Sequence, residues 1–583
     1  MSNPPIPAVR VATMEAVNYT PVMLGNAAGL VITPSPKGCI TIATPSKALI
    51  GKSRWLLRAL IQDLGLAGYQ EAEYWPGIQI SLKNGKETLK LGLVQLIYGT
   101  TATKQQRTVT ARPWKALYTV RARPSSLIVR PDRHYTKEPT TTRYSLATMG
   151  LDDRSKDLKV PIEPGSLRLK VEILRRPLPR SLHMPMDTEA IEALDYLVAG
   201  LTIVTLRILG IGQGSNRGFG RFKITRCKIY SKLENEICEI IGKLDNVSIS
   251  ESDAENYIKQ AIDKLQYLIQ KVTGKKGKNT VLIDRECIKV YKLDYNTINC
   301  LNEMYSKLPG FKGQSMPKDP IHRSLEVIGL ATLKVTWKNI NKKGRAGGGA
   351  YHTWILGLPR RQNQSKVERC LNNGKKPPTG YLLKASSDDD ATVILEKRKD
   401  LYVAVDSGSN AEKYINGRRQ SPVIMFPVND RGEMIAVIPF KPIGMEELVD
   451  KLYHAGGLAH TIKKGRKTIL KFLDAVRLAE VGVIAKQGYR KVTHNCHGDR
   501  YANNKVRGVA RPHSGTRCSR NDSDNLSENN NLVDEAYDAA LAFINEILTY
   551  RNCSENSYRQ GQERKSSRVY GSGKLRKYGF YGL

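Results

Sequence analysis

The sequence has no long apolar run, no regular cysteine spacing and no secretion signal. No stretch approaches the ~18 consecutive apolar residues of a membrane-spanning helix, and no basic helix carries a face of Trp, Phe and Leu. The N-terminal residues Met1-Ser-Asn-Pro-Pro-Ile-Pro7 contain no basic segment followed by an apolar one. The nine cysteines lack a C-x-x-C motif or a disulfide-framework spacing, which fits a reducing compartment. These absences argue against a membrane protein and predict a cytoplasmic one.

Carboxylates are also scarce relative to basic residues. The chain has 92 Lys and Arg against 55 Asp and Glu, so its net charge is +37. A thermophilic surface would normally carry matching glutamates, which this chain lacks. An excess of basic residues spread along a chain is typical of proteins that bind nucleic acid. The composition therefore predicts a polyanionic partner.

A glycine-rich loop at residues 210–222 is the most informative segment. It reads Gly-Ile-Gly-Gln-Gly-Ser-Asn-Arg-Gly-Phe-Gly-Arg-Phe. Its glycines allow positive φ angles and close approach of a ligand to the backbone, and Asn216, Arg217 and Arg221 supply donors for an anion. A flexible surface turn is the alternative interpretation.

The order of elements around this loop excludes two common phosphate-binding motifs. A dinucleotide fingerprint and a P-loop both run strand, loop, helix. Here a predicted helix (188–209) precedes the loop and a predicted strand (219–230) follows it. Ser215 stands where the third glycine of G-x-G-x-x-G belongs, and Ser46 replaces the first glycine of a P-loop ending at Gly51-Lys52-Ser53. Nucleotide hydrolysis at these segments is not expected.

Hydrophobic patterns along the first part of the chain predict a β-α-β-β-α-β unit. This is the ferredoxin-like split motif, the topology of RRM-type RNA-binding domains. The predicted elements are a strand at 11–19, a helix at 46–64, strands at 116–129 and 166–174, the helix at 188–209 and the strand at 219–230.

The chain length predicts more than one domain. We expect an α+β protein with two tandem ferredoxin-like domains and helical insertions. The predicted boundaries are 1–240 for the first domain, 241–309 for a helical insertion or linker, 310–550 for the second domain, and 551–583 for a basic, disordered tail. Elements predicted in the second domain are a strand at 330–337, a second glycine-rich loop at 344–350, a hairpin of 423–428 with 434–440, and helices at 444–455, 466–487 and 532–550.

Further basic residues accompany these elements. On the helix at 46–64, Arg54 and Arg58 are four residues apart and share a face, with Lys52 half a turn away. Trp55 lies beside them, and packing in the core is favoured over stacking on a base. In the second domain, Arg345 lies in the glycine-rich loop, and Arg418 and Arg419 precede Ser421-Pro422 at the start of a strand, where arginines can hold phosphates. Solvated surface arginines are the alternative in each case.

Catalytic and metal motifs are weak. Metal-independent RNA cleavage needs a histidine or similar acid/base, and the nearest histidines in the sequence to the loop at 210–222 are His134 and His183. The run Asp388-Asp389-Asp390 lacks the spaced carboxylates of two-metal chemistry. A cluster of five zinc-type ligands fits no common zinc-finger spacing, so a structural zinc and an irregular exposed loop stay open. These ligands are His494, Cys496, His497, His513 and Cys518.

Four segments resemble a known family, the RAMP superfamily of CRISPR-associated proteins. Gly212–Gly220 is similar to the G-loop of that superfamily. The segment Ile50-Gly-Lys-Ser-Arg-Trp-Leu-Leu-Arg-Ala59, followed by Leu96-Ile-Tyr-Gly-Thr100, resembles the signature of the Cmr subunit that caps the filament of a type III-B effector complex. Gly417-Arg-Arg-Gln-Ser-Pro422 resembles the Arg-x-Ser-Pro element of a second RAMP unit. Tyr98 departs from the family's usual Phe.

The resemblance implies two ferredoxin-like domains that hold single-stranded RNA and pack against a backbone subunit. It implies no catalytic role, and the partners would be guide RNA, target RNA and other Cmr subunits; we expect no cofactor. The residues that we predict to bind RNA, from the resemblance and from their own charge and position, are Lys52, Arg54, Arg58, Asn216, Arg217, Arg221, Arg345, Arg418 and Arg419. Two alternatives stay open: a guide-processing ribonuclease of the same superfamily, and a basic scaffold that contacts only proteins and does not need Arg217 to be exposed.

Overall fold

The computed structural model describes about half of the chain in detail. The described residues are 8–24, 40–41, 45–69, 71–82, 88–100, 115–126, 128–130, 132, 161–177, 182–183, 186–212, 214–230, 236–277, 282–308, 315–332, 336, 355–356, 380–383, 394–398, 401–405, 421–441, 452–455, 459–464, 467–472, 476–477 and 528–551.

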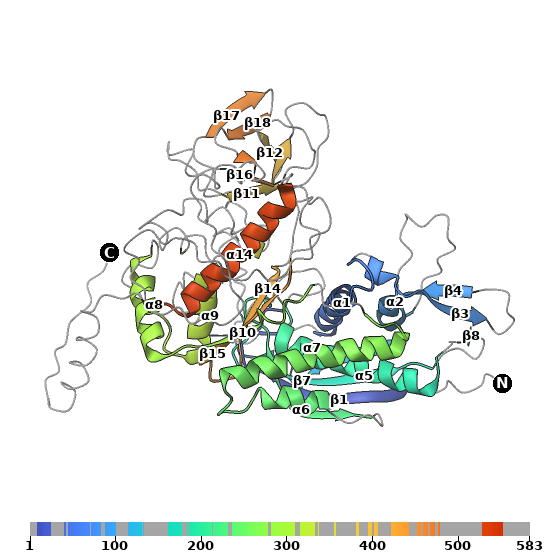
Figure 1. The fold of residues 1–583 in the computed structure, drawn as a ribbon. Helices are drawn as coiled ribbons and strands as arrows, with labels where there is room; N and C mark the ends of the chain where they lie inside the picture. The colour runs from blue at the N-terminus through green and yellow to red at the C-terminus, as the bar shows by residue number, and fades with distance from the viewer. Residues whose placement is uncertain are drawn as a thin grey trace, which may run out of the picture.

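A four-stranded antiparallel sheet forms the first folded unit (Figure 1). Its strand order is β5-β7-β1-β9, and the helices α1 and α5 make the two connections of a β-α-β-β-α-β chain. This order is that of the ferredoxin-like fold, so the predicted split motif is confirmed. The bounds are β1 Val9–Asn18, α1 Ser46–Asp63, β5 Tyr118–Pro124, β7 Arg168–Arg175, α5 Thr188–Val204 and β9 Phe222–Ile229.

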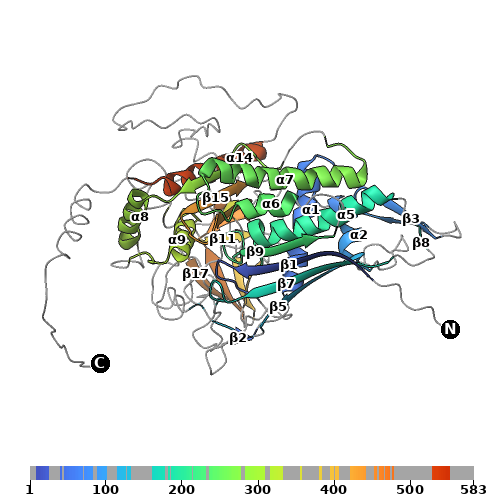
Figure 2. The ribbon, with the colours of Figure 1, turned by 90° about the horizontal axis from the view of Figure 1, so that it is seen from below.

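Helices cover one face of this sheet. Figure 2 shows α5, α6 (Glu236–Lys243) and α7 (Glu251–Thr273) on the same side of β9, β1, β7 and β5. Alternate residues of β7, Leu169, Val171 and Ile173, are buried in the core under these helices. Because strand side chains alternate between faces, the intervening residues of β7 point to the opposite face of the sheet.

Two irregularities change this alternation. The pairing of β1 with β7 shifts between Arg10 and Ala12, so Val11 has no partner on β7. The pairing of β1 with β9 shifts between Glu15 and Ala16, which leaves Thr225 between the paired residues Ile224 and Arg226. Each is a β-bulge. After each bulge, the side chains lie on the opposite face of the sheet from the one that strict alternation would give them.

The end of the second connecting helix is wound more widely than an α-helix. α5 continues into a π-helix, η2 (Thr205–Leu209), and Gly210 N donates to Thr205 O at 2.7 Å. The whole run from Ala193 to Leu209 is buried, including Arg207. The π-helix η2 is followed directly by the glycine-rich loop, which begins at Gly210.

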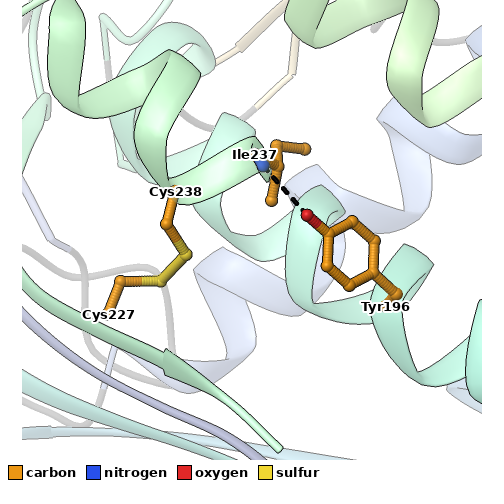
Figure 3. Close-up of a disulfide and its surroundings, with 4 residues drawn as sticks. All are labelled: Tyr196, Cys227, Ile237 and Cys238. Carbon is orange, nitrogen blue, oxygen red and sulfur yellow. Dashed lines mark hydrogen bonds between the residues drawn. A yellow bond between two sulfur atoms is a disulfide. The ribbon is translucent and has the colours of Figure 1, made fainter. Parts of the chain in front are cut away.

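A disulfide joins the sheet to the additional helices. Cys227 of β9 is bonded to Cys238 of α6, and the Tyr196 hydroxyl of α5 accepts a hydrogen bond from Ile237 N at 2.9 Å (Figure 3). Cys227 lies on the helix-covered face of β9 and packs against the core. The sequence, with its irregular cysteine spacing, had indicated reduced cysteines rather than this bond.

A second antiparallel sheet contains the predicted hairpin, which is confirmed. Its order is β10-β15-β14, and β10, which lies within the predicted insertion, pairs with β15. The order matches the first three strands of a ferredoxin-like unit; no fourth strand pairs with β10 among the described residues. The elements are β10 Lys289–Lys292, α8 Tyr295–Lys307, α9 Pro320–Thr332, β14 Val423–Pro427, β15 Met434–Pro439 and α14 Glu528–Leu548.

Some second-domain predictions are wrong for the residues that the structure describes. The strand predicted at 330–337 is wrong at its start, because Leu330, Ala331 and Thr332 are the last residues of α9. All three are buried, so burial gives no periodicity there to separate helix from strand. The helices predicted at 444–455 and 466–487 contain strands β16, β18 and β19. Here Gly465-Arg466 joins two runs with β-branched residues, a hairpin signal, and Lys464 pairs with Lys467. The helix predicted at 532–550 is confirmed as α14.

Smaller strands complete the described chain. Two further sheets lie in the first half, with orders β4-β3-β8 and β2-β6, and two in the second half, with orders β11-β16-β19 and β13-β12-β18-β17. No helix in the described part is long and apolar enough to span a membrane. The remaining bounds are β2 Ile40–Thr41, η1 Glu71–Glu73, β3 Ile78–Leu82, β4 Thr88–Leu91, α2 Leu93–Tyr98, β6 Ile128–Val129, β8 Leu182–His183, β11 Gly380–Leu383, β12 Ile394–Arg398, β13 Leu401–Val405, β16 Leu452–Ala455, β17 Ala459–Lys464, β18 Lys467–Phe472 and β19 Val476–Arg477.

Candidate nucleic-acid interface

The glycine-rich loop is fixed against the start of the chain. Gly220 has φ +70°, its N–H donates to Pro21 O at 2.9 Å, and its carbonyl accepts from Ile211 N at 2.9 Å. A Cβ at Gly220 would lie 1.9 Å from Ile211 O. The loop therefore folds back on itself through a close backbone contact that only glycine permits.

The same loop pairs with the second sheet. Met425 N of β14 donates to Asn216 O at 3.0 Å, and Arg217 forms a parallel bridge with Met425. Around Gly218, the side chains of Leu325 and Pro427 lie so close that a Cβ would meet them at 2.7 and 3.0 Å. The loop is thus a joint between the two sheets and not a free surface turn.

Three of the segments that carry the family resemblance meet at Asn216. Lys52 Nζ of α1 donates to Asn216 Oδ1 at 2.9 Å, and Asn216 Nδ2 donates to Ser421 O at 3.3 Å. Ser421 belongs to the Arg-x-Ser-Pro element. We call this cluster of Lys52, Asn216, Arg217, Arg221 and Ser421 the motif junction.

The cations of the motif junction have no carboxylate partner among the described residues. Burial lowers the pKa of Lys52 to about 7, with a further contribution from the nearby Arg221 guanidinium. Burial likewise lowers the pKa of Arg217 to about 10 and that of Arg221 to about 9. Arg221 is fully buried and Lys52 and Arg217 are half-buried, so these three cations, without a counter-ion among the described residues, favour an anion at this site.

Arg221 is the most deeply placed of the three. Its Nη1 donates to Ser215 O at 2.6 Å and Phe219 O at 2.8 Å, and the guanidinium lies 5.1 Å from the centroid of the Phe426 ring. Its side chain is fully buried, and its Nε and Nη2 have no hydrogen-bond partner among the described residues. In this position Arg221 contributes charge and loop geometry, whereas direct contact with a polymer would require the loop to open.

Arg54 and Arg58 share one face of α1, as predicted, and both are partly exposed. Arg54 pairs with Glu73 of η1; Arg58 Nη2 donates to Tyr69 O at 2.8 Å, and its guanidinium stacks over the Tyr69 ring at 4.0 Å. Their side chains are 34% and 22% exposed, and Arg58 Nε also lies 3.8 Å from Glu73 Oε2. These contacts hold the two guanidinium groups in place beside the helix.

Trp55 packs in the core, which confirms the favoured interpretation. Its ring lies 5.5 Å from that of Phe440, and the Lys52 ammonium lies 4.8 Å from the Trp55 ring centroid. This contact places α1 against the end of the second sheet.

Arg207 is a residue of this region that the sequence analysis missed. It is fully buried in η2 and donates to the Tyr19 hydroxyl at 2.6 Å, to Asp245 Oδ1 at 2.8 Å and to Val428 O. Val428 follows β14, so Arg207 ties the first unit to the hairpin of the second sheet. The only signal in the sequence is one arginine within the apolar run before the glycine-rich loop.

Several predicted residues lie outside the described residues. Among them are the RNA-binding candidates Arg345, Arg418 and Arg419, the histidine His134, the run Asp388–Asp390, the second glycine-rich loop and the tail. The five zinc-type ligands between His494 and Cys518 also lie outside. Within the described part, no group of three His, Cys, Asp or Glu side chains could hold a metal ion.

Comparison with known proteins gives structural similarities only. No protein-family model and no curated protein sequence matches the chain. Solved structures similar to it include the apo crystal structure of Cmr1 from Pyrococcus furiosus, at 13% identity and a TM-score of 0.32, covering 74% of this chain and 87% of that one.

A second similar structure is a cryo-EM structure of the type III-B Cmr-beta bound to cognate target RNA and AMPPnP in the presence of ssDNA. Its chain is 13% identical, with a TM-score of 0.40 and coverage of 76% of this chain and 97% of that one. These names fall in the family that the sequence motifs resemble. At 13% identity and TM-scores of 0.32 and 0.40, these similarities assign no function to this chain. The ferredoxin-like fold is established by the strand order of the chain itself.

Proposed function

We propose that this chain is a non-catalytic RNA-binding subunit of a type III-B (Cmr) CRISPR effector complex. It would cap the filament at the 3′ end of the guide RNA and help to capture target RNA in antiviral defence. The observation that carries the proposal is the motif junction, where Lys52 of α1, Asn216 of the glycine-rich loop and Ser421 are joined by hydrogen bonds.

The chemistry of the junction suits a phosphate. Lys52 and Arg217 are half-buried cations without a carboxylate partner among the described residues; burial lowers the pKa of each, and an anion would offset that effect. The partly exposed Arg54 and Arg58 lie further along α1 and share one carboxylate, Glu73, between them, so one positive charge of the pair is uncompensated within the described part of the chain. Binding through phosphates would give little sequence preference.

The alternative, a metal-independent endoribonuclease, needs an available general base. Among the described histidines, His322 of α9 lies near the loop, since Leu325 of the same helix contacts Gly218. Its Nε2 lies 2.7 Å from Asp132 Oδ2 and its Nδ1 lies 2.6 Å from Asp319 Oδ1. Although burial opposes it, these two carboxylates raise the pKa of His322 to about 9, so the imidazole stays protonated at neutral pH. This arrangement favours a structural role for His322.

The direct test mixes the purified full chain with labelled single-stranded RNA in EDTA, on native and denaturing gels across a salt series. We expect intact RNA that is retained at low salt and released as salt rises, because counterion release governs phosphate binding. Discrete cleavage products that vanish in a His134→Ala or His183→Ala variant would instead establish the nuclease. Absence of retention at low salt would contradict RNA binding by this chain.

Lys52 predicts a pH dependence of RNA affinity. Its pKa is about 7 in the free protein, because burial disfavours the ammonium. A bound phosphate favours the ammonium and raises this pKa, so binding takes up a proton above pH 7. RNA affinity should therefore fall by up to roughly tenfold as the pH rises from 7 to 8. The window ends there because the pKa of Arg221 is about 9, so that this second cation begins to lose its charge above pH 8. Fluorescence anisotropy at constant ionic strength measures the fall in affinity.

Two variants isolate the contribution of Lys52. Lys52→Arg keeps its charge over this pH range and should flatten the profile, whereas Lys47→Met removes an exposed lysine of the same helix and should leave the profile's shape unchanged. A Lys52→Arg protein with the wild-type pH profile would exclude Lys52 as the titrating group.

A further inference from the structure

The face of the first sheet that the helices leave open is strongly basic. Side chains of β5 and β7 alternate, so that Tyr118, Val120 and Ala122 are buried while Arg121 and Arg123 are exposed. In β7, Arg168 and Lys170 are exposed between buried residues. In β9, Arg226 and Lys228 are exposed on either side of Cys227, which faces the helices. We call these six cations the basic sheet face.

The strand register places these cations in rows across the sheet. Arg123 is opposite Lys170, Lys170 is opposite Glu15, and Glu15 is opposite Arg226. In the next row, Arg121 is opposite Glu172, and Thr13 separates Glu172 from Lys228. Opposite residues on one face lie about 5 Å apart, so each row is a continuous line of polar side chains from β5 to β9.

Charge on this face is poorly compensated. The six named cations share the open side of these strands with Arg10 and Lys223 and with two carboxylates, Glu15 and Glu172. Arg226 pairs with Glu15 at 3.4 Å, and the arginine side chain is 79% exposed. Arg121, Arg123, Arg168 and Lys170 have no ion-pair partner among the residues that the structure describes. Neighbouring like charges repel one another, so an anionic ligand would stabilise this face.

The composition of the face identifies the kind of ligand. Protein–protein interfaces concentrate aromatic side chains and exclude charges at their centre, whereas the open sides of these four strands carry Arg, Lys, Glu, Thr, Val and Leu. RRM-type sheets read bases by stacking them on several aromatic residues. Here the exposed aromatic beside the face, among the described residues, is Tyr230 directly after β9, whose hydroxyl lies 3.5 Å from Thr13 Oγ1 and whose ring centroid lies 4.9 Å from Lys228 Nζ. The face therefore presents mainly cations, which bind phosphates, and phosphates carry no sequence information.

The face adjoins the motif junction through the chain itself. β9 begins at Phe222, the residue after Arg221, and Lys223 Nζ pairs with Asp430 Oδ2 of the β14–β15 turn at 3.2 Å. An RNA strand held at the junction would thus have a cationic surface beginning at the next residues.

We propose that the basic sheet face is a second RNA-binding surface, which holds the phosphate backbone of single-stranded RNA without sequence preference. This inference rests on the proposed function, since it takes RNA as the ligand. It assigns a role to a surface that neither the glycine-rich loop nor α1 includes.

The test is the triple variant Arg123→Ala, Lys170→Ala, Arg226→Ala in the full chain. Its matched control is Lys243→Ala, Lys275→Ala, Lys276→Ala, which removes three exposed cations from the helical side. Binding of labelled mixed-sequence RNA and of oligouridine of equal length is measured by anisotropy across a salt series. We expect the face variant to bind both RNAs roughly tenfold or more weakly, with a salt slope smaller by about 2, since each lost phosphate contact removes about 0.7.

The outcomes separate this inference from the proposed function. A face variant that binds like the control overturns the inference, as does a loss confined to one of the two RNAs. If wild-type protein retains RNA and Lys52→Met alone weakens it, the proposed function stands and the face is excluded. If wild-type protein retains no RNA, both fail. The charge-conserving variant Arg123→Lys, Lys170→Arg, Arg226→Lys should keep wild-type binding, and a loss there would also overturn the inference.

Discussion

Replacing Arg207 with methionine should lower the free energy of unfolding by about 3–5 kcal/mol. The guanidinium is fully buried and donates to the Tyr19 hydroxyl, Asp245 Oδ1 and the Val428 carbonyl. Methionine fills most of the volume but leaves these acceptors unsatisfied and the Asp245 carboxylate, whose side chain is 12% exposed, without its partner. Urea denaturation followed by tryptophan fluorescence measures the change.

The control for Arg207 is a surface ion pair of the same chemistry. Arg130 pairs with Glu163 at 3.2 Å, and the arginine side chain is 74% exposed. Arg130→Met should cost less than about 1 kcal/mol, because exposed pairs are screened by water. Equal losses in the two variants would show that Arg207 is not the buried link between β14 and the first unit.

Replacing Gly220 with alanine should destabilise the chain by more than about 3 kcal/mol. Two effects add at this position. A φ of +70° is unfavourable for a residue with a Cβ, and that atom would lie 1.9 Å from Ile211 O, which is backbone and cannot rotate away. Because the neighbouring Asn216 and Arg217 pair with Met425, loss of the loop geometry should also weaken RNA binding. Thermal unfolding and anisotropy measure the two effects.

Gly242 provides the matched control. It lies in α6 and is exposed, and no neighbouring group lies within 4 Å of the position that an added Cβ would take. Gly242→Ala should be neutral or stabilise by up to about 1 kcal/mol, since alanine has the higher helix propensity. A Gly220→Ala protein as stable as Gly242→Ala would mean that the loop does not require its positive φ angle.

Local patterns predicted the first unit well. The helix predicted at 46–64 and the strand predicted at 219–230 have nearly the bounds of α1 (Ser46–Asp63) and β9 (Phe222–Ile229). Apolar spacing and flanking glycines are local signals, so the sequence alone shows them. In the second half, the same reasoning failed at Leu330–Thr332, which are buried residues at the end of α9 and not the start of a strand. Periodicity cannot distinguish the two when every side of an element is covered.

The environment of the glycine-rich loop could not be predicted. Asn216 and Arg217 carry the pattern of an exposed anion-binding turn, but their neighbour Met425 lies about two hundred residues along the chain and forms a backbone pair with the loop. Likewise, the alternating Arg121 and Arg123 are visible in the sequence, but the line from Arg123 to Arg226 depends on the order β5-β7-β1-β9. Long-range pairing, which no local pattern encodes, decided both features.

The one extra residue of the bulge at Thr225 decides which side chains of β9 lie on the basic sheet face. After the bulge, the side chains of Arg226 and Lys228 lie on the open face of the sheet, and Cys227 lies on the face that α6 covers. If the strand were straightened with every residue kept, the two cations would point at α6 and the cysteine would lose its partner. Deleting Thr225 itself would instead leave all the other residues of β9 on their present faces, because it is the extra residue. Homologous chains should therefore either keep this bulge or be one residue shorter here.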